Sequence, residues 1–520
     1  MIRRVVSQRG VYRDSITLLR VSQGVQKVAG VRQAAVVMAT PLNKRVLGDI
    51  GFVGSDIDDA TPDDLVIAVE AEGEGPLNEA LKATERLLSS PAAGAGVRRA
   101  SSGISDALSR SPDANLAVIS VPGAYAKHEA MVAIRAGLNA FVFSSDVPRE
   151  DERELKEIAS KRHLLVMGPD CGTSIINHVV LGFGNAVRPG PVGIVSASGT
   201  GLQEVSTLIH KHGLGISQAI GTGGGDLSDT VGGITTRQAL RLLQVDAETR
   251  IIVLISKPPG EKTARAILSD VRSSRKPVII TFLGAQFAPP RLGKHMWART
   301  LGDAANAACA LASKSSVRAN ASNISRTAFA EAAKLSKSQR YVRGLYAGGT
   351  LCYEAQVVLE PKLGPIYSNA PLDRRYAIAG AARSKRHSCI DMGAEEFVGG
   401  RAHPMIDFTL RKLRIIEEAK DPETAVLLLD VELGLGSNSD PAGELAPAIA
   451  DAKALAMKGG RYLCVVASVV GTEGDFQGLS EQTRRLEGSG AVLASCNSEA
   501  AELAALIATR GETAKGGRSR

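Results

Sequence analysis

Two segments combine glycine with threonine where an apolar strand is expected to run into a helix. Ser198, Gly199 and Thr200 follow VGIVSA, and Gly348, Gly349 and Thr350 follow VRGLYA. The first turn of a helix carries backbone N–H groups without intrahelical partners, and the helix dipole favours negative charge there. Glycine lets a ligand approach this backbone, and threonine adds a hydroxyl donor. Both segments therefore predict binding of phosphate or a similar anion.

The first of these turns has further groups that can complete an anion site. Ser196 precedes it, and the glycine-rich turn Gly221–Gly225 follows one β/α unit later. A single Gly-Thr turn is more often an ordinary strand-to-helix connection with a capping hydroxyl. Two copies in the same context instead favour a site in which two helix N-termini face one phosphate. The candidate catalytic residues are then Thr200 and Thr350, and the candidate binding residues are Ser196, Ser198, Gly199, Gly223, Gly224, Gly348 and Gly349.

Two other turns are expected at the carboxyl ends of parallel strands, where open α/β sheets bind ligands. Their candidate cofactor-binding residues are Ser120, Pro122 and Lys127 in one turn, and Pro169, Asp170 and Cys171 in the other. Rigid turn chemistry explains these residues equally well, because proline fixes φ and aspartate caps turns.

The histidines give weaker signals. His403 lies in GRAHPMID close to Arg401 and Asp407, which makes it a candidate catalytic residue, although a structural role fits equally well. His295 also lies in a loop near a strand end. Nothing in the sequence indicates a lowered thiol pKa for the cysteines at the predicted turns. No spacing of Cys and His residues predicts a metal site.

The order of apolar segments predicts an α/β protein of several domains. Residues 1–95 resemble a small ferredoxin-like or ACT-like unit, followed by a linker at 91–112. Strand and helix patterns then alternate through 113–188, 189–313 and 340–510, which predicts parallel, doubly wound sheets. Residues 314–339 are expected to form a linker or a peripheral helix, and 511–520 a disordered tail.

An internal repeat relates the last two of these segments. In both, the Gly-Thr turn is followed by a glycine-containing turn, a Gly-Gly pair, a long amphipathic segment and an Asp-x-Glu-Thr turn that begins at Asp246 or Asp421. Self-similarity of this kind indicates duplication of one structural unit. We therefore expect two flavodoxin-like domains, each with its Gly-Thr turn in the same place.

The composition is that of a globular protein whose ligands are small anions. Of 520 residues, 44% are hydrophobic and 22% charged. The 62 basic and 54 acidic residues give a net charge of +8, but the basic residues are scattered, which favours phosphate, CoA or nucleotides over nucleic acid. Six cysteines without CxxC spacing, no apolar leader and no membrane-length apolar stretch predict a cytoplasmic protein.

Longer segments resemble known enzymes. VISVPGAYAKHEAMVAIRAG and LLVMGPDCGTSIIN resemble the CoA-binding domain of the succinyl-CoA ligase α subunit, and VGIVSASGTGLQEVS with IGTGGGDL resembles its first ligase domain. YAGGTLCYEA, CIDMGAEEF and AVLLLDVELG resemble the ligase domain of the β subunit. Across nearly the whole chain, segments such as SGTGLQEVSTLIH, AIGTGGGDLSD, GRAHPMID and SDPAGELAPAI resemble the FdrA family. The resemblance implies a Rossmann-like CoA-binding domain at 113–188 and ligase-type flavodoxin-like domains at 189–313 and 340–510.

The chain departs from the ligase pattern where ligases transfer phosphate. Ligase α subunits carry a phosphorylated histidine in GHAG and a supporting glutamate in GEIGG. This chain has GKHMWAR, with His295, and SKPPG, with Lys257 in place of the acid. A lysine suits a bound anion better than the support of an imidazole, so Lys257 joins the candidate catalytic residues. No ATP-grasp segment is present, and a nucleotide is not expected to bind this chain alone.

The resemblance implies an acyl-CoA synthetase-like enzyme subunit that works through an acyl or carbamoyl phosphate, with CoA or phosphate as cofactor. The FdrA family is associated with purine-ureide breakdown, where this chain resembles a subunit of an oxamate-type carbamoyltransferase. A CoA- or phosphate-sensing subunit without catalytic activity is the alternative. The expected partners are a small anionic substrate, further protein subunits and a second copy of the chain, but neither nucleic acid nor membrane.

Overall fold

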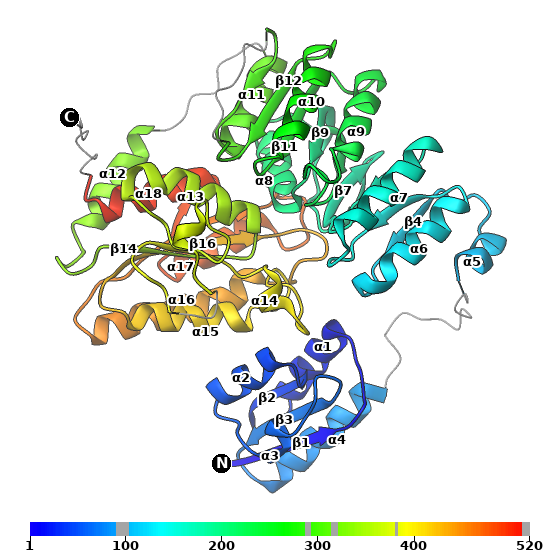
Figure 1. Cartoon of the computed structure of the whole chain (residues 1–520). Coiled ribbons are helices and arrows are strands. Elements are labelled where there is room, and N and C mark those ends of the chain that lie inside the picture. The colour runs from blue at the N-terminus through cyan, green and yellow to red at the C-terminus, as the bar shows by residue number, and fades with distance from the viewer. Residues whose placement is uncertain (90–102, 286–292, 314–320, 380–382, 512–520) are drawn as a thin grey trace. The chain divides into compact units, whose positions relative to one another are not determined.

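The structure is a computed structural model that describes residues 1–89, 103–285, 293–313, 321–379 and 383–511 (Figure 1). It contains two compact units, Met1–Ala100 with Met392–Arg411, and Ser101–Asp391 with Lys412–Arg520. Parts of the predicted linkers, 90–102 and 314–320, and 512–520 of the predicted tail lie outside the described residues. Of the helices described, none combines the length and apolar character needed to cross a bilayer. The cytoplasmic location stays a prediction.

The first unit is a three-stranded antiparallel sheet of order β1-β3-β2. Its elements are β1 (Ile2–Gln8), α1 (Ser15–Gln26), β2 (Val31–Met38), α2 (Pro41–Asp49), α3 (Ser55–Asp58), β3 (Leu65–Ala71), α4 (Glu74–Ser89) and α14 (Glu395–Val398). The small α/β domain predicted here is confirmed. Strand β1 is not evident in the sequence because it is an edge strand, in which the exposed Arg3 and Arg4 interrupt the apolar pattern.

The second unit begins with a three-stranded parallel sheet of order β4-β5-β6. Its elements are α5 (Ile104–Arg110), β4 (Leu116–Ile119), α6 (Gly123–Arg135), β5 (Asn139–Val142), α7 (Arg149–Lys161) and β6 (Val166–Met167). Helix α5 forms inside the segment predicted as a linker, which corrects that prediction for residues 104–110. Because the strands are parallel, their carboxyl ends lie at one edge, and the turns with Ser120 and Pro169 share that edge.

A seven-stranded sheet of order β13-β12-β11-β9-β10-β7-β8 follows. Its elements are β7 (Thr173–Ile176), β8 (Val179–Gly182), β9 (Pro189–Ser196), α8 (Gly199–Lys211), β10 (Ile216–Gly221), α9 (Ile234–Val245), β11 (Ile251–Ser256), α10 (Glu261–Arg272), β12 (Val278–Phe282), β13 (Met296–Trp297) and α11 (Leu301–Ser313). Strands β9 to β13 are parallel in the order 2-1-3-4-5 of flavodoxin-like folds. The antiparallel β7–β8 hairpin extends the sheet beyond β10.

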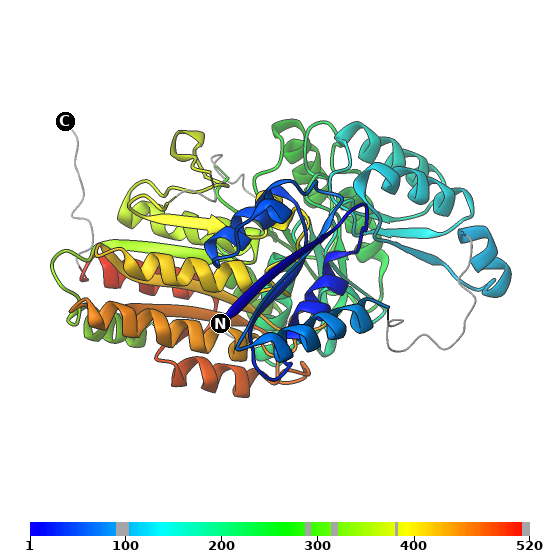
Figure 2. The ribbon, with the colours of Figure 1, turned by 90° about the horizontal axis from the view of Figure 1, so that it is seen from below.

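A five-stranded parallel sheet of order β15-β14-β16-β17-β18 repeats this strand order. Its elements are α12 (Ala321–Ala332), β14 (Tyr341–Tyr346), α13 (Gly349–Leu363), a 3-10 turn at Arg374–Tyr376, β15 (Ser388–Asp391), α15 (Thr409–Lys420), β16 (Thr424–Glu432), α16 (Pro441–Lys458), β17 (Cys464–Val470), α17 (Leu479–Gly488), β18 (Val492–Ala494) and α18 (Asn497–Ala508). Helices cover both of its faces (Figures 1 and 2). The shared order confirms the predicted pair of flavodoxin-like domains.

The two flavodoxin-like halves share one apolar core, to which α8, α11, α13 and α18 all contribute buried residues. Two buried glutamate side chains connect the halves reciprocally. Glu204 of α8 accepts a hydrogen bond from the backbone N–H of Asn497, at the start of α18, over 2.8 Å. Glu354 of α13 accepts one from the backbone N–H of Leu301, at the start of α11, over 2.6 Å. Each half therefore caps a helix of the other, which fixes α8 against α13.

Candidate functional site

The two predicted Gly-Thr turns meet in the folded chain. Ser198 Oγ donates a hydrogen bond to Thr350 Oγ1 over 2.6 Å, and both side chains are buried. A Cβ placed on Gly348 would lie 3.1 Å from Thr200 Cβ. The N-termini of α8 and α13 therefore lie side by side, as the duplicated turns led us to expect. We refer to residues 198–200 and 348–350 as the paired Gly-Thr turns.

In the first turn, the serine side chains form hydrogen bonds with the backbone of the turn itself. Ser196 Oγ donates to the backbone carbonyl of Ser198 over 2.7 Å and accepts from the backbone N–H of Ser198 over 3.0 Å. Ser198 Oγ also accepts from the backbone N–H of Gly201 over 2.9 Å and so caps α8. Gly199 and Thr200 are half-buried, and binding of a ligand by them stays a prediction.

A buried hydroxyl from β7 lies against the first turn. Thr173 is 1% exposed, and its Oγ1 has no hydrogen-bond partner in the part of the chain that the structure describes. This oxygen lies 3.2 Å from the position that a Cβ on Gly199 would take. A buried hydroxyl without a partner costs about 1–3 kcal/mol, which a hydrogen bond to a bound anion would offset.

The second turn is surrounded by acidic side chains. The carboxylate of Asp430 accepts hydrogen bonds from the backbone N–H groups of Ala347 over 2.8 Å and Gly348 over 2.7 Å. A Cβ on Gly349 would lie 2.5 Å from Asp391 Oδ2. The N-cap residue of α13 is Gly348, which has no side chain to cap the helix, so these carboxylates stand at its N-terminus instead. The second turn is therefore less suited to a free anion than the first.

Lys257 lies between the two halves. It follows β11, and its ammonium group lies 5.5 Å from the ring centroid of Tyr353 in α13. Its positive charge opposes the effect of burial on the pKa of Asp170 and of Cys352. The structure thus brings Thr200 and Thr350 together and places Lys257 at the end of the strand next to β9, close to Tyr353 of α13.

The cysteines near these turns are poor nucleophiles. Burial raises the pKa of the Cys171 thiol to about 11 and raises that of the Cys352 thiol well above its usual range. The thiolate is the nucleophilic form, so neither side chain is active near neutral pH. Backbone N–H groups, hydroxyls and Lys257 are therefore the candidates for chemistry at this site.

The turn that carries Pro169, Asp170 and Cys171 packs against the glycine-rich turn after β10. A Cβ on Gly223 would lie 2.1 Å from the backbone carbonyl oxygen of Pro169, and one on Gly224 would lie 3.1 Å from Asp170 Oδ2. Only glycine permits so close an approach. Withdrawal from water raises the pKa of Asp170 although part of the side chain stays exposed, and the charges of Arg149 and Lys257 oppose this rise. Gly223 and Gly224 thus shape the turn around Asp170.

The edge with Ser120 and Pro122 does not offer the cations that CoA phosphates need. The ammonium group of Lys127 forms ion pairs with Asp151 over 2.6 Å and Glu154 over 2.7 Å. Arg149, at the start of α7, likewise pairs with an acidic residue of its own helix. A polyanion requires basic groups that are not already neutralised. CoA binding by these residues stays a prediction.

His403, the fourth predicted catalytic residue, belongs to the first unit, whereas the paired Gly-Thr turns belong to the second. Its Nδ1 accepts a hydrogen bond from the backbone N–H of Met405 over 3.3 Å. The neighbouring Arg401 donates to Asn43 Oδ1 over 2.9 Å and to Asp407 Oδ2 over 2.7 Å. These contacts tie the segment to α2, and a catalytic role for His403 stays a prediction.

His295 lies at the opposite edge of the seven-stranded sheet from the Gly-Thr turn. Its Nδ1 accepts a hydrogen bond from the backbone N–H of Val278, the first residue of β12, over 3.1 Å. Ser196 and Lys257 stand at the carboxyl ends of β9 and β11 instead. The structure therefore offers no support for His295 as a phosphorylated residue.

Sequence reasoning missed three residues at the paired Gly-Thr turns: Thr173, Asp391 and Asp430. Asp430 interrupts the continuous apolar strand AVLLLDVELG, and a charge in a fully buried strand is itself a functional signal. Asp391 ends the shorter strand SCID in the same way. Thr173 gave no such signal, because its position against Gly199 depends on how β7 pairs with β10.

Three protein-family models match parts of the chain. A CoA-ligase model matches residues 345–507, a CoA-binding domain model matches 187–284, and a model described as the AllF heavy metal-associated domain matches 1–102. The first two cover the β14–α13 and β9–α8 turns, respectively. The CoA-binding match thus lies on the first flavodoxin-like half, after the 113–188 segment to which the resemblance assigned CoA binding.

One relative spans the whole chain. It is the uncharacterized protein YahF of Escherichia coli K12, which is 40% identical over 512 residues, 98% of this chain and 99% of YahF. This chain belongs to the YahF family. Its CoA-binding and CoA-ligase domains place it in the succinyl-CoA ligase superfamily. The predicted multidomain α/β fold is confirmed.

Succinate–CoA ligase α subunits match a shorter stretch of this YahF family member. The Archaeoglobus fulgidus subunit is 32% identical over 191 residues, and the Aquifex aeolicus subunit is 32% identical over 189. The chain spans 64% and 60% of these subunits, less than two thirds of either. A solved dinucleotide-forming acetyl-coenzyme A synthetase from Ca. Korarchaeum cryptofilum covers 76% of this chain and 83% of its own at 17% identity, with a TM-score of 0.28, too low to support an argument.

The donor atoms of residues 1–102 do not fit a heavy metal. Soft metal ions bind cysteine thiolates and histidine imidazoles. Residues 1–102 contain neither cysteine nor histidine. Across the described ranges of the chain, no group of three His, Cys, Asp or Glu residues is placed to hold a metal ion. The domain is thus similar to a heavy metal-associated domain in sequence but not in its donor atoms.

Proposed function

We propose that this YahF family member is an FdrA-type enzyme subunit that transfers an acyl or carbamoyl group to or from phosphate at the paired Gly-Thr turns. The hydrogen bond between Ser198 and Thr350 carries the proposal, because it places two helix N-termini against one another. Helix N-termini with hydroxyl donors bind phosphate. Similarity to CoA ligases supports an enzyme of that superfamily, and similarity to their α subunits supports further subunits.

In the proposed reaction a phosphate oxygen attacks a carbonyl carbon. The bond from that carbon to its leaving nitrogen, oxygen or sulfur then breaks, and the leaving group takes up the proton that phosphate loses. The products are an acyl or carbamoyl phosphate and the protonated leaving group. Negative charge grows on the carbonyl oxygen as the tetrahedral intermediate forms, and preorganised N–H donors stabilise it. Gly199, Thr200 and Lys257 are the groups in place to hold phosphate and this oxygen.

The acidic surroundings of the second turn favour a carbamoyl group over other acyl groups. Asp430 and Asp391 stand at the N-terminus of α13, where a carboxylate accepts hydrogen bonds and repels a second anion. The NH2 of a carbamoyl group is a donor that such carboxylates can orient. Phosphate at α8 and the carbamoyl nitrogen at α13 would align the two reactants, which is the main contribution that a site without a strong nucleophile can make.

The test is phosphate-dependent turnover. The chain is co-expressed with the products of its neighbouring genes, supplied with oxalurate and phosphate, and assayed for carbamoyl phosphate and oxamate. We expect both products, only when phosphate is present. Thr200→Val should reduce turnover by roughly tenfold or more, because it removes a donor to a charged group. The matched control is Thr230→Val, at an exposed threonine after the glycine-rich turn.

Three outcomes would contradict the proposal. Unchanged turnover in both Thr200→Val and Thr350→Val would remove the paired Gly-Thr turns from the mechanism. Formation of a CoA ester from ATP and a carboxylic acid, without carbamoyl phosphate, would restore the CoA-ligase alternative. Binding of phosphate or CoA with no turnover in the presence of all partners would favour a sensing subunit.

A further inference from the structure

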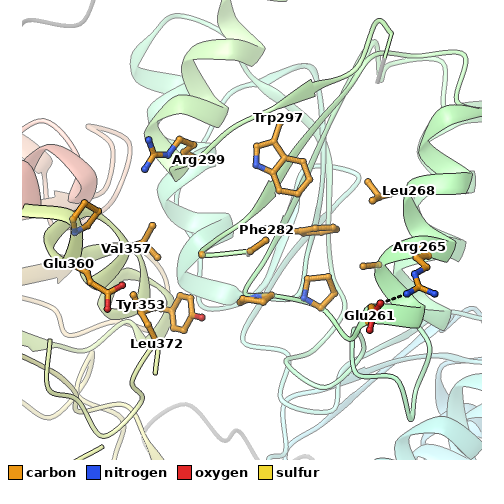
Figure 3. A pocket seen from close by; sticks show the side chains of 16 residues that line it. Glu261, Arg265, Leu268, Phe282, Trp297, Arg299, Tyr353, Val357, Glu360 and Leu372 are labelled. Carbon is orange, nitrogen blue, oxygen red and sulfur yellow. Dashed lines mark hydrogen bonds and ion pairs between the residues drawn. The ribbon is translucent and has the colours of Figure 1, made fainter. Parts of the chain in front are cut away.

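A cavity of about 850 Å³ lies between the two flavodoxin-like halves, next to Lys257 (Figure 3). Pro258 and Pro259, which directly follow Lys257, line it from the first half, together with α10 and the ends of β12 and β13. Tyr353, whose ring Lys257 contacts, lines it from the second half. The volume is that of a site for an organic ligand. Tyr353 therefore both lines this cavity and contacts Lys257.

The walls of the cavity are mainly apolar and aromatic. Trp297 packs edge-on against Phe282, with ring centroids 5.6 Å apart. In Figure 3 these two rings and Tyr353 border the same space, with Val357 and Leu268 on opposite sides. Aromatic and aliphatic walls of this kind bind apolar or planar groups, because the transfer of such groups from water to an apolar site is favourable.

The lining of the cavity has two acidic and two basic residues, so its formal net charge is zero. Glu261 and Arg265 form an ion pair on α10. Arg299 and Glu360 also line the cavity, and within the described ranges neither side chain has a hydrogen bond or ion pair. One unpaired guanidinium suits one carboxylate, which it can bind through two N–H groups. Glu360 repels a second negative charge, so a polyanion such as CoA is a poor fit.

We infer that this cavity binds the apolar body of a substrate with a single carboxylate, which Arg299 holds. The inference rests on the proposed function only for the far end of the substrate, which would present its reacting carbonyl to Lys257. A small polar ureide such as oxalurate would leave most of the aromatic wall without contacts. The cavity therefore also accommodates a bulkier, more apolar acyl or carbamoyl donor than the oxalurate that tests phosphate-dependent turnover.

Trp297 makes binding directly measurable, because it is the only tryptophan in the chain. We would titrate the purified full chain with 3-phenylpropionate and follow tryptophan emission. The comparison ligands are 3-phenylpropionamide, which lacks the charge, succinate, which carries two, and CoA. A saturable change is expected with 3-phenylpropionate, and binding at least about tenfold weaker with the other three, because an ionic hydrogen bond and a single charge set the preference.

Arg299→Gln should weaken binding of 3-phenylpropionate by roughly tenfold. The matched control is Arg250→Gln, at an exposed arginine before β11 that does not line the cavity, and it should leave binding unchanged. Val357→Phe, on the wall opposite the α10 side, should block the apolar part of the cavity whatever the charge of the ligand. Thermal unfolding of each variant would show that the fold is intact.

No saturable change, equal binding to Arg299→Gln and the parent chain, or tighter binding of CoA would each overturn the inference. Failure of phosphate-dependent turnover is a separate result. If turnover fails but Trp297 reports binding that depends on Arg299, the result supports the proposed carboxylate site in the cavity and contradicts the proposed reaction. If oxalurate turns over but no carboxylate binds at Trp297, the result supports the proposed reaction and shows that the cavity does not bind its substrate.

Discussion

The first and second flavodoxin-like halves place a Gly-Thr turn at the same point of the same strand order, yet they differ in charge. Strand β9 pairs with β11, and β14 with β16, in matching register, so Leu254 and Leu429 occupy equivalent positions. Three residues further along each strand lie Lys257 in the first half and Glu432 in the second. The duplicated unit thus has a basic residue in the first half and an acidic residue in the second half at equivalent positions.

The neighbouring strands show the same contrast. Gly221, opposite Ser196, corresponds to Asp391, opposite Tyr346. Around the first turn stand a lysine, glycines and a buried hydroxyl, whereas carboxylates stand around the second. The backbone of the duplicated unit therefore sets the geometry, and substitutions at its strand ends decide which part of a ligand each turn can accept. Substitutions that reverse this difference between the turns, or that remove a contact between the halves, test whether the difference affects ligand binding and stability.

The largest expected effect concerns the glutamates that join the halves. Burial raises the pKa of Glu354 from 4.5 to about 8. The folded chain then keeps a proton that the unfolded chain loses above pH 4.5, so this contribution to stability is complete at low pH and is lost as pH rises toward 8. Between pH 5 and 8 the free energy of unfolding should fall by about 4 kcal/mol from this group. Urea unfolding across that range measures it.

Glu354→Gln is the control for this prediction, because glutamine does not titrate. Its unfolding free energy should vary less with pH than that of the parent chain, whatever its absolute value. Glu204→Gln should flatten the curve in the same direction, since burial also raises the pKa of Glu204. Equal slopes in parent and variants would mean that the reciprocal caps do not carry the protons assigned to them.

The next effect concerns the charge contrast itself. Lys257→Glu gives the first half the charge that the second half has at the equivalent position. We expect phosphate affinity, measured by isothermal titration, to fall by roughly a hundredfold, because a favourable ionic contact becomes a repulsion. Lys262→Glu makes the same change at an exposed position of α10 and should have little effect. Equal losses in both variants would show that only net charge matters.

The glycines of the two turns should differ in their tolerance of a side chain. Gly349→Ala places a Cβ 2.5 Å from a buried carboxylate oxygen of Asp391, and Gly199→Ala places one 3.2 Å from Thr173 Oγ1. We expect Gly349→Ala to lower the free energy of unfolding by about 2 kcal/mol and Gly199→Ala by less than about 0.5 kcal/mol. Urea denaturation of the pair measures the difference, and a reversed order would contradict the assigned packing.

The smallest effect separates the two threonines. Thr350→Val removes the acceptor for the Ser198 hydroxyl and should destabilise the fold by about 1 kcal/mol. Thr200 has no hydrogen-bonded side-chain partner in the described chain and is half-buried, so Thr200→Val should change stability by less than that while weakening phosphate binding. Thermal unfolding and phosphate titration of both variants give the comparison. Similar stability losses would mean that the threonines have the same role.

Much of the fold follows from local patterns in the sequence. The apolar runs, the glycine-rich turns and the repeated Asp-x-Glu-Thr segment are sufficient to predict both flavodoxin-like halves. Strand β1 was missed because an edge strand needs only one paired side and tolerates arginines. The sequence predicts a linker at 104–110, but this segment forms α5, because a helix of 7 residues has too few periodic positions to stand out.

The sequence by itself determined that two Gly-Thr turns precede helices and that the unit containing them is duplicated. Turn chemistry and hydrophobic periodicity are properties of short segments, so these features need no tertiary information. Only the tertiary structure decided that Ser198 meets Thr350, that Thr173 lies against Gly199 and that His403 belongs to another unit. Those contacts depend on strand register and on the packing of one half against the other, which no local pattern encodes.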